Sequence, residues 1–181
     1  LGWEEFRGLR FGLTEAVLVP RPETEALADV ALGLLPPVAV GYRPLVIDVG
    51  TGAGCLACAL AAERPDVDVV AIDVCPAAAT IARENASRLG LARQVRVIAA
   101  DLFAALGGVR AELIVSNPPY LPTAALEMLQ PEVRDHDPRV ALDGGADGLD
   151  LIAPLVAGAA ACLGPSGALA LAPAGGAPSA A

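Results

Sequence analysis

Four consecutive residues, Asn117-Pro118-Pro119-Tyr120, carry the groups needed to hold a planar –NH2 group. The two prolines lack a backbone N–H and stiffen the chain, so carbonyl oxygens beside them are left free to accept hydrogen bonds. Asn117 adds a side-chain carbonyl, and Tyr120 adds a flat face and a hydroxyl. An amide nitrogen is a poor nucleophile because its lone pair is delocalised, so accepting both of its hydrogens would aim it and support developing charge. The motif therefore predicts chemistry at the nitrogen of an amide or of a nucleobase amine.

A second candidate feature is the glycine-rich turn Asp48-Val49-Gly50-Thr51-Gly52-Ala53-Gly54, which follows an apolar run and precedes an Ala/Leu-rich segment. Glycines there permit a tight turn and close approach of the backbone to a ligand. The dinucleotide fingerprint would need a third glycine where the sequence has Cys55. G-x-G-x-G with an acid two residues earlier is instead typical of methyltransferases that use S-adenosylmethionine. The residues predicted to contact that cofactor are Gly50, Thr51, Gly52, Ala53 and Gly54.

Two acidic residues follow later apolar runs. Asp73 ends a β-branched run, and a carboxylate there can accept both hydroxyls of a ribose. The alternative for Asp73 is an acid at the start of the next helix. Asp101 is placed to accept the amino group of an adenine, and Leu102 and Phe103 to flank its ring, although Phe103 fits an ordinary core position equally well.

Strand and helix patterns alternate along the chain, which predicts a parallel α/β sheet. The expected strands are 45–49, 68–73, 95–98, 112–116 and 168–171, and the expected helices are 23–35, 55–63, 76–89 and 149–163. Residues 1–22 read as an extended arm or hairpin, and the long proline-containing stretch 121–148 reads as a lid or binding segment. The predicted division is an N-terminal arm and first helix (1–37), a methyltransferase domain (38–172) and a disordered tail (173–181).

Composition limits the partners. The net charge is −9, all twelve basic residues are arginine and none form a cluster, so nucleic acid is a disfavoured partner. Mean hydropathy is +0.56, but the longest apolar stretch, 151–163, is too short for a membrane span of about 20 residues. With no signal-peptide pattern at the first residues, a cytoplasmic protein is expected. The cysteines at positions 55, 58, 75 and 162 lack metal spacing and are interpreted as small core residues, so no metal site is predicted.

Four ordered segments together resemble the HemK/PrmC family, the release factor glutamine methyltransferases. They are Val19–Glu25, Asp48–Gly54, Asn117–Tyr120 and Glu132–Gly145. The resemblance implies a class I S-adenosylmethionine-dependent methyltransferase (Rossmann-like) fold and methylation of the GGQ glutamine of a peptide chain release factor. It further implies cofactor contacts from Gly50–Gly54, Asp73, Leu102 and Asn117, a glutamine held by Asn117–Tyr120, and a loop, Pro20–Glu25, that walls the site.

The chain departs from that family at both ends. We expect the helical domain that docks the release factor to be missing from this segment, and the last two strands of the sheet to be missing where an Ala/Gly/Pro/Ser sequence stands. One alternative function is an adenine-amino methyltransferase acting on nucleic acid, because the Asn117–Tyr120 motif also suits an exocyclic amine. The other, which follows from the ends, is a truncated protein that binds the cofactor without catalysis. The sequence leaves the oligomeric state undetermined.

Overall fold

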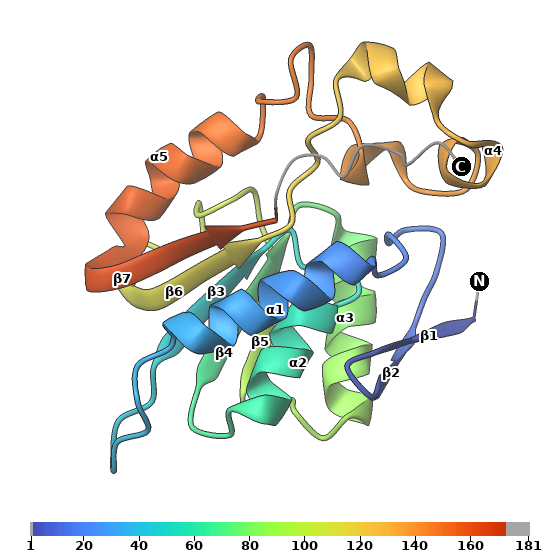
Figure 1. Ribbon diagram of the computed structural model, residues 1–181. Coiled ribbons are helices and arrows are strands. Elements are labelled where there is room, and N and C mark those ends of the chain that lie inside the picture. Colours follow the sequence, from blue (N-terminus) through green and yellow to red (C-terminus); the bar gives the residue numbers. More distant parts are fainter. Residues whose placement is uncertain (1, 173–181) are drawn as a thin grey trace.

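The predicted strands form one parallel sheet of five strands in the order β5-β4-β3-β6-β7. Figure 1 shows these strands lying side by side. The computed structural model describes residues 2–172. The strands are β3 (Leu45–Val49), β4 (Asp68–Asp73), β5 (Val95–Ala99), β6 (Ala111–Ser116) and β7 (Leu163–Leu171). All neighbouring pairs are parallel, so the carboxyl ends of the strands meet at one edge of the sheet.

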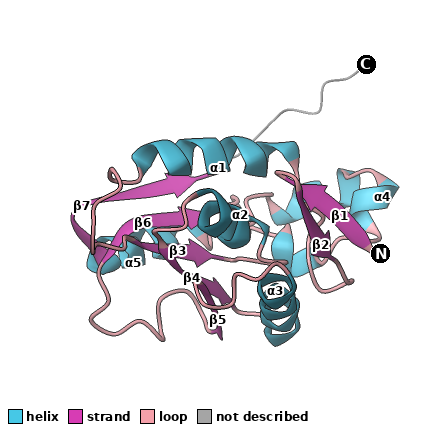
Figure 2. Ribbon diagram, turned by 90° about the horizontal axis from the view of Figure 1, so that it is seen from below, coloured by secondary structure: helices cyan, strands magenta, loops and turns pink. Residues whose placement is uncertain are grey.

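Helices cover both faces of this sheet (Figure 2). Three pack on one face, α1 (Pro22–Leu34), α2 (Cys55–Glu63) and α3 (Pro76–Arg88), and α5 (Ile152–Cys162) packs on the other. Successive strand residues point to opposite faces, so Val46 joins the core beneath α1 to α3 whereas Ile47 joins the core beneath α5. Burial on both faces explains why these strands read as continuous apolar runs.

The N-terminal arm is a hairpin of β1 (Trp3–Phe6) and β2 (Leu9–Gly12). Its turn residues, Arg7 and Gly8, both have positive φ (50° and 73°), as a two-residue turn of type I′ requires. Phe6 and Phe11 are fully buried and meet edge to face, with ring centroids 6.3 Å apart. The Arg7 side chain also pairs with Glu63 of α2 and Asp29 of α1, so the hairpin is fastened to the helical layer.

A buried asparagine joins this hairpin to the glycine-rich turn. Asn85 of α3 donates from Nδ2 to the carbonyl oxygens of Gly12 (3.0 Å) and Ala53 (2.8 Å). Its Oδ1 accepts the backbone N–H of Gly12 at 2.9 Å. Because Asn85 is 2% exposed, these bonds satisfy a polar side chain that would otherwise be costly to bury.

The segment between β6 and α5 is built from short helices. They are η1 (Thr123–Met128), α4 (Pro131–Arg134) and η2 (Arg139–Ala141). Each begins at or just after a proline, at Pro122, Pro131 and Pro138, because the fixed φ of proline suits a helix start and its missing N–H is not needed there. The prolines that indicated a loop in the sequence therefore start three helical turns.

Element types were predicted correctly along the sheet, and the largest differences in bounds occur at the C-terminal end. Strand β7 begins at Leu163, five residues before the predicted start, and a register shift lies between Ala111 and Leu113 of its partner β6. The added part of the strand contains Pro165, which is tolerated in a strand at the edge of the described sheet or at a bulge. The predicted tail, 173–181, lies outside the described residues.

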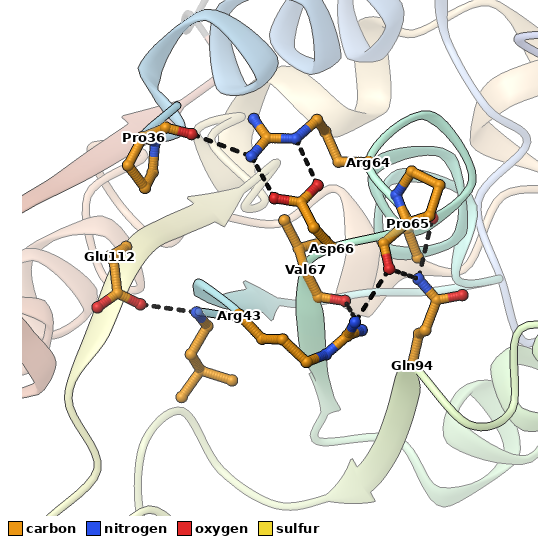
Figure 3. A network of polar contacts seen from close by, with 10 residues as sticks. Pro36, Arg43, Arg64, Pro65, Asp66, Val67, Gln94 and Glu112 are labelled. Atoms are coloured by element: carbon orange, nitrogen blue, oxygen red, sulfur yellow. Dashed lines mark hydrogen bonds and ion pairs between the residues drawn. The ribbon is translucent and has the colours of Figure 1, made fainter. Parts of the chain in front are cut away.

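Two arginines, Arg43 and Arg64, stabilise the loops at the amino ends of the strands, opposite to the edge that carries the cavity. Figure 3 shows this polar network, in which side chains bond to the loop carbonyls and neighbouring acids. The pairs are Arg43 to Val67, Arg64 to Pro36 and Asp66, Gln94 to Pro65, and the backbone N–H of Leu45 to Glu112. These basic groups are therefore engaged in structural contacts. Within residues 2–172, the helices are too short or too polar for a membrane span.

Candidate active site

A cavity of about 160 Å³ lies at the carboxyl ends of β3, β4, β5 and β6, where their following loops converge. This is the edge at which open parallel sheets bind ligands. The structure brings to it most of the residues selected from the sequence. Those that line the cavity are Gly50, Thr51, Gly52, Ala53, Asp73, Asp101, Leu102, Asn117, Pro118 and Pro119.

The glycine-rich turn forms the floor of this cavity. Gly50 and Gly52 have φ of 72° and 54°, and a Cβ at either position would meet no neighbouring atom within 4 Å, so the space above the backbone is open. The N–H groups of Gly50 and Thr51 both donate to the carbonyl of Ile72, at 2.8 and 2.9 Å, which fastens the turn to β4. Gly54 lies outside the lining; a Cβ there would stand 3.1 Å from that of Ala82, so α3 explains this glycine.

Asp48 supports the turn from below. Its Oδ2 accepts the Thr51 hydroxyl at 2.6 Å and the Ala57 N–H at 3.2 Å, and the side chain is 2% exposed. Burial raises the pKa of Asp48 to about 6, because desolvation of the carboxylate outweighs these two hydrogen bonds. The acid that precedes the glycines therefore organises Thr51 and the start of α2.

Asp73 makes the helix-start contact that was one of its two interpretations, and it also lines the cavity. One carboxylate oxygen accepts the N–H of Gly52 at 2.8 Å, and the other accepts the N–H of Cys75, the N-cap residue of α3, at 2.9 Å. Each oxygen can accept a second hydrogen bond, and the residue lines the cavity. Asp73 thus holds the glycine-rich turn against α3 while keeping acceptor capacity toward a ligand.

The predicted adenine-side residues separate into two groups. Asp101 and Leu102 line the cavity, and Leu102 has a φ of 43°, a left-handed conformation that is costly for a branched side chain. The Phe103 ring packs against α5, where a Cβ at Gly158 would stand 2.5 Å from its Cδ2. Phe103 is therefore a core residue, the second of its two predicted roles.

Asn117 stands at the end of β6 with its side chain anchored to α1. Its Nδ2 donates to the hydroxyl oxygen of Thr24 at 3.1 Å. Ser116, just before it, donates its hydroxyl to the carbonyl of Val49 at 2.7 Å and so ties β6 to β3. Tyr120 is half-buried and lies outside the cavity lining, with its carbonyl close to Gly148.

The remaining walls come from segments far apart in the sequence. Val19, Arg21 and Thr24 line the cavity from the N-terminal side, and Val140 and Ala141 line it from η2. Arg21 pairs with Asp137 at 2.5 Å, which joins the two walls. The resemblance implied a wall from Pro20–Glu25, and the stretch 121–148 was predicted as a lid or binding segment. That Val140 and Ala141 are the residues of this stretch that line the cavity follows from packing.

Three of the four cysteines, Cys55, Cys58 and Cys162, are buried, and Cys75 is half-buried. Cys55 and Cys58 are buried, and desolvation raises the pKa of both thiols, which disfavours the reactive thiolate. Among residues 2–172 the structure contains no cluster of three or more His, Cys, Asp or Glu side chains suited to a metal ion.

Comparison with known proteins gives consistent results. A family model, the methyltransferase small domain, matches residues 33–130. The chain is 47% identical over 92% of its length to a release factor glutamine methyltransferase of Geobacter sulfurreducens, and 51% identical over 94% to one of Deinococcus radiodurans. It spans 56% and 59% of those relatives. A solved S-adenosylmethionine-dependent methyltransferase of Thiobacillus denitrificans, in complex with S-adenosyl-L-homocysteine, shares the fold, with a TM-score of 0.51 and 20% identity over 83% of this chain and 48% of that one.

Proposed function

This chain belongs to the methyltransferase small domain family, and from that premise we propose that it forms the catalytic core of a protein-(glutamine-N5) methyltransferase acting on peptide chain release factors. The observation that carries the proposal is the meeting, in one cavity, of the open glycine-rich turn and the Asn117–Pro119 end of β6. The relatives named release factor glutamine methyltransferase supply the substrate class. Such a reaction would take place in the cytoplasm, where translation terminates.

The residues that line the cavity suit the groups of S-adenosylmethionine. Gly50 and Gly52 leave open space above the backbone, where the methionine part would lie. Asp73 has acceptor capacity for the ribose hydroxyls, and Asp101 and Leu102 stand on the adenine side. Thr51 and Ala53 complete the floor. We assign these residues to cofactor binding and Asn117 to the boundary between cofactor and substrate.

The substrate amide is held by acceptors. The Asn117 side-chain carbonyl and the backbone carbonyl of Pro118 would each accept one hydrogen of the glutamine –NH2, with Pro119 stiffening the turn and Tyr120 packing against the amide plane. When bound, S-adenosylmethionine would supply an electrophilic methyl group: the N–C bond would form as the C–S bond breaks, the electron pair would stay on sulfur, and the nitrogen would release one proton to water. The protein contributes orientation and stabilisation of positive charge on the nitrogen.

Electrostatics favours a protein substrate over a nucleic acid. Arg21 is the single basic residue among those lining the cavity, and it is paired with Asp137. Three acidic residues, Asp48, Asp73 and Asp101, line the same space. A base-flipping enzyme needs cationic surface to hold the phosphate backbone near its pocket, which this rim does not offer.

The proposal keeps the division of the chain into an arm with the first helix (1–37), a methyltransferase domain (38–172) and a tail (173–181). Support comes from the family match at 33–130 and from the sheet at 45–171. The arm is packed on the domain through Asn85 and Arg7, so it also buttresses the cofactor turn.

The test is transfer of labelled methyl from S-adenosylmethionine to a purified release factor, beside a factor whose GGQ glutamine is replaced by alanine and an adenine-containing oligonucleotide. Label is expected on the wild-type factor alone. The Asn117→Ala variant should lose transfer while calorimetry still detects weakened cofactor binding. Label on the oligonucleotide would move the assignment to nucleic acid, and full transfer by Asn117→Ala would refute the site.

If neither substrate is labelled while cofactor binding persists, the chain acts as a cofactor-binding core that does not turn over by itself. A longer relative, such as the release factor glutamine methyltransferase of Geobacter sulfurreducens, is the positive control for the substrate preparation. That control separates an inactive chain from an unmethylatable factor.

A further inference from the structure

We propose that Thr24 is a positioning residue that fixes the orientation of the Asn117 side-chain amide, so that its carbonyl oxygen and not its –NH2 faces the substrate. The inference rests on the proposed function, because it concerns how Asn117 recognises the substrate –NH2. Its starting observation is the hydrogen bond from Asn117 Nδ2 to the Thr24 hydroxyl oxygen, 3.1 Å long and spanning 93 residues of sequence.

The orientation matters because the two ends of an asparagine amide have nearly the same shape and opposite hydrogen-bonding character. With Oδ1 toward the cavity, Asn117 accepts a hydrogen of the substrate amide. After a 180° flip, the Asn117 –NH2 would face the substrate –NH2. Two donors would then meet, and the substrate nitrogen would lose this hydrogen bond. In this structure the Thr24 hydroxyl oxygen is the acceptor behind Asn117 that engages Nδ2, which leaves Oδ1 free to accept from the substrate.

Thr24 is placed to be such a fixed acceptor. It is 7% exposed and lies in the first turn of α1, where its N–H donates to the carbonyl of Arg21 at 2.9 Å. Helix α1 packs on β6, the strand that ends at Asn117, so helix and strand hold the two partners in a constant relation. Arg21 is in turn paired with Asp137, which anchors the loop before Thr24.

The first experiment observes the Asn117 side-chain amide directly by NMR. The chain contains two asparagines, Asn85 and Asn117, so labelling asparagine side chains with ¹⁵N gives two –NH2 groups in an NMR spectrum. Asn117→Ala assigns them. In Thr24→Val, which keeps the shape but removes the acceptor, the Asn117 –NH2 signals should shift and exchange faster with water, and the Asn85 signals should stay in place. Thr24→Ser should restore the wild-type positions.

The second experiment measures the effect of Thr24 on the rate of methyl transfer. Thr24→Val should lower kcat for release-factor methylation by about ten- to a hundredfold, the effect of losing one orienting hydrogen bond, with a much smaller change in the dissociation constant of S-adenosylmethionine. Thr24→Ser should recover most of the activity. A merely structural role would instead lower the melting temperature of Thr24→Val and weaken cofactor binding in parallel.

Different results would overturn the positioning role of Thr24 and the proposed methyltransferase function. Unchanged Asn117 –NH2 signals in Thr24→Val, or full kcat in a variant whose signals have moved, would overturn the positioning role and leave the methyltransferase assignment intact. Absence of methyl transfer by the wild-type chain would instead count against the proposed function. The NMR comparison, which needs no substrate, would then decide whether Thr24 fixes the Asn117 amide.

Discussion

At the scale of single residues, two carboxylates that line the cavity, Asp48 and Asp73, have different surroundings. Asp73 lies at the cavity wall and accepts two backbone N–H groups, whereas Asp48 is enclosed beneath the glycine-rich turn. Enclosure favours the neutral acid, so the pKa of Asp48 is raised to about 6. Below that pH the protonated Asp48 becomes a donor as well as an acceptor, and its bonds to Thr51 and Ala57 must adjust.

This predicts a pH dependence of stability that Asp48→Asn removes. Between pH 4 and 6 the native state keeps a proton that the unfolded chain has released, so the contribution of Asp48 to the free energy of unfolding falls as pH rises through this window. Relative to Asp48→Asn, the wild type should lose up to about 3 kcal/mol between these limits. Urea unfolding of both proteins at several pH values measures the difference. A difference that stays constant with pH would show that Asp48 does not titrate there.

At the scale of elements, two helical glycines make a matched pair. Gly158 of α5 faces the Phe103 ring, and an added Cβ would stand 2.5 Å from it, whereas Gly33 of α1 has no atom within 4 Å of that position. Gly158→Ala should therefore lower the free energy of unfolding by about 1–3 kcal/mol, because the ring must move. Gly33→Ala should raise it by about 0.5–1 kcal/mol through helix propensity.

Chemical denaturation of the two variants beside the wild type checks both signs. Stabilisation by both substitutions would mean that the Phe103 ring moves aside without cost. Destabilisation by both substitutions would mean that helix propensity does not determine the change in the free energy of unfolding at Gly33.

Element bounds illustrate what local sequence can decide. The strands 45–49 and 68–73 were predicted to the residue, because strands covered on both faces are largely apolar, here with aspartate only at Asp48, Asp68 and Asp73, and a glycine or turn follows each strand. Strand β7 was predicted too short: its first five residues, 163–167, include two glycines and a proline, and their place in the sheet depends on the pairing with β6. An edge position and a bulge, both properties of the assembled sheet, admit those residues.

At the scale of the whole molecule, the Arg21–Asp137 pair joins segments 116 residues apart across the cavity. Asp137 is 7% exposed and Arg21 is 39% exposed, so the pair is partly shielded from water. A double-mutant cycle with Arg21→Met and Asp137→Asn should give a coupling of about 1 kcal/mol in the free energy of unfolding.

The control cycle uses Arg134→Met and Asp135→Asn, a neighbouring pair whose side chains are 43% and 50% exposed. Its coupling should be close to zero, since solvent screens an exposed pair. Equal couplings in both cycles would show that the Arg21–Asp137 contact does not hold the two walls together.

The sequence by itself determined the fold class, most element bounds, the glycine-rich turn and the Asn117–Tyr120 motif. These features are local: burial sets the apolar period of a strand, and a positive φ selects glycine at Gly50 and Gly52. The tertiary structure alone decided that Thr24 meets Asn117, that Asn85 joins the hairpin to Ala53, and which residues of the stretch 121–148, Val140 and Ala141, reach the cavity. Contacts between distant segments depend on how helices pack over the sheet, and single-residue types along the chain carry no signal of that packing.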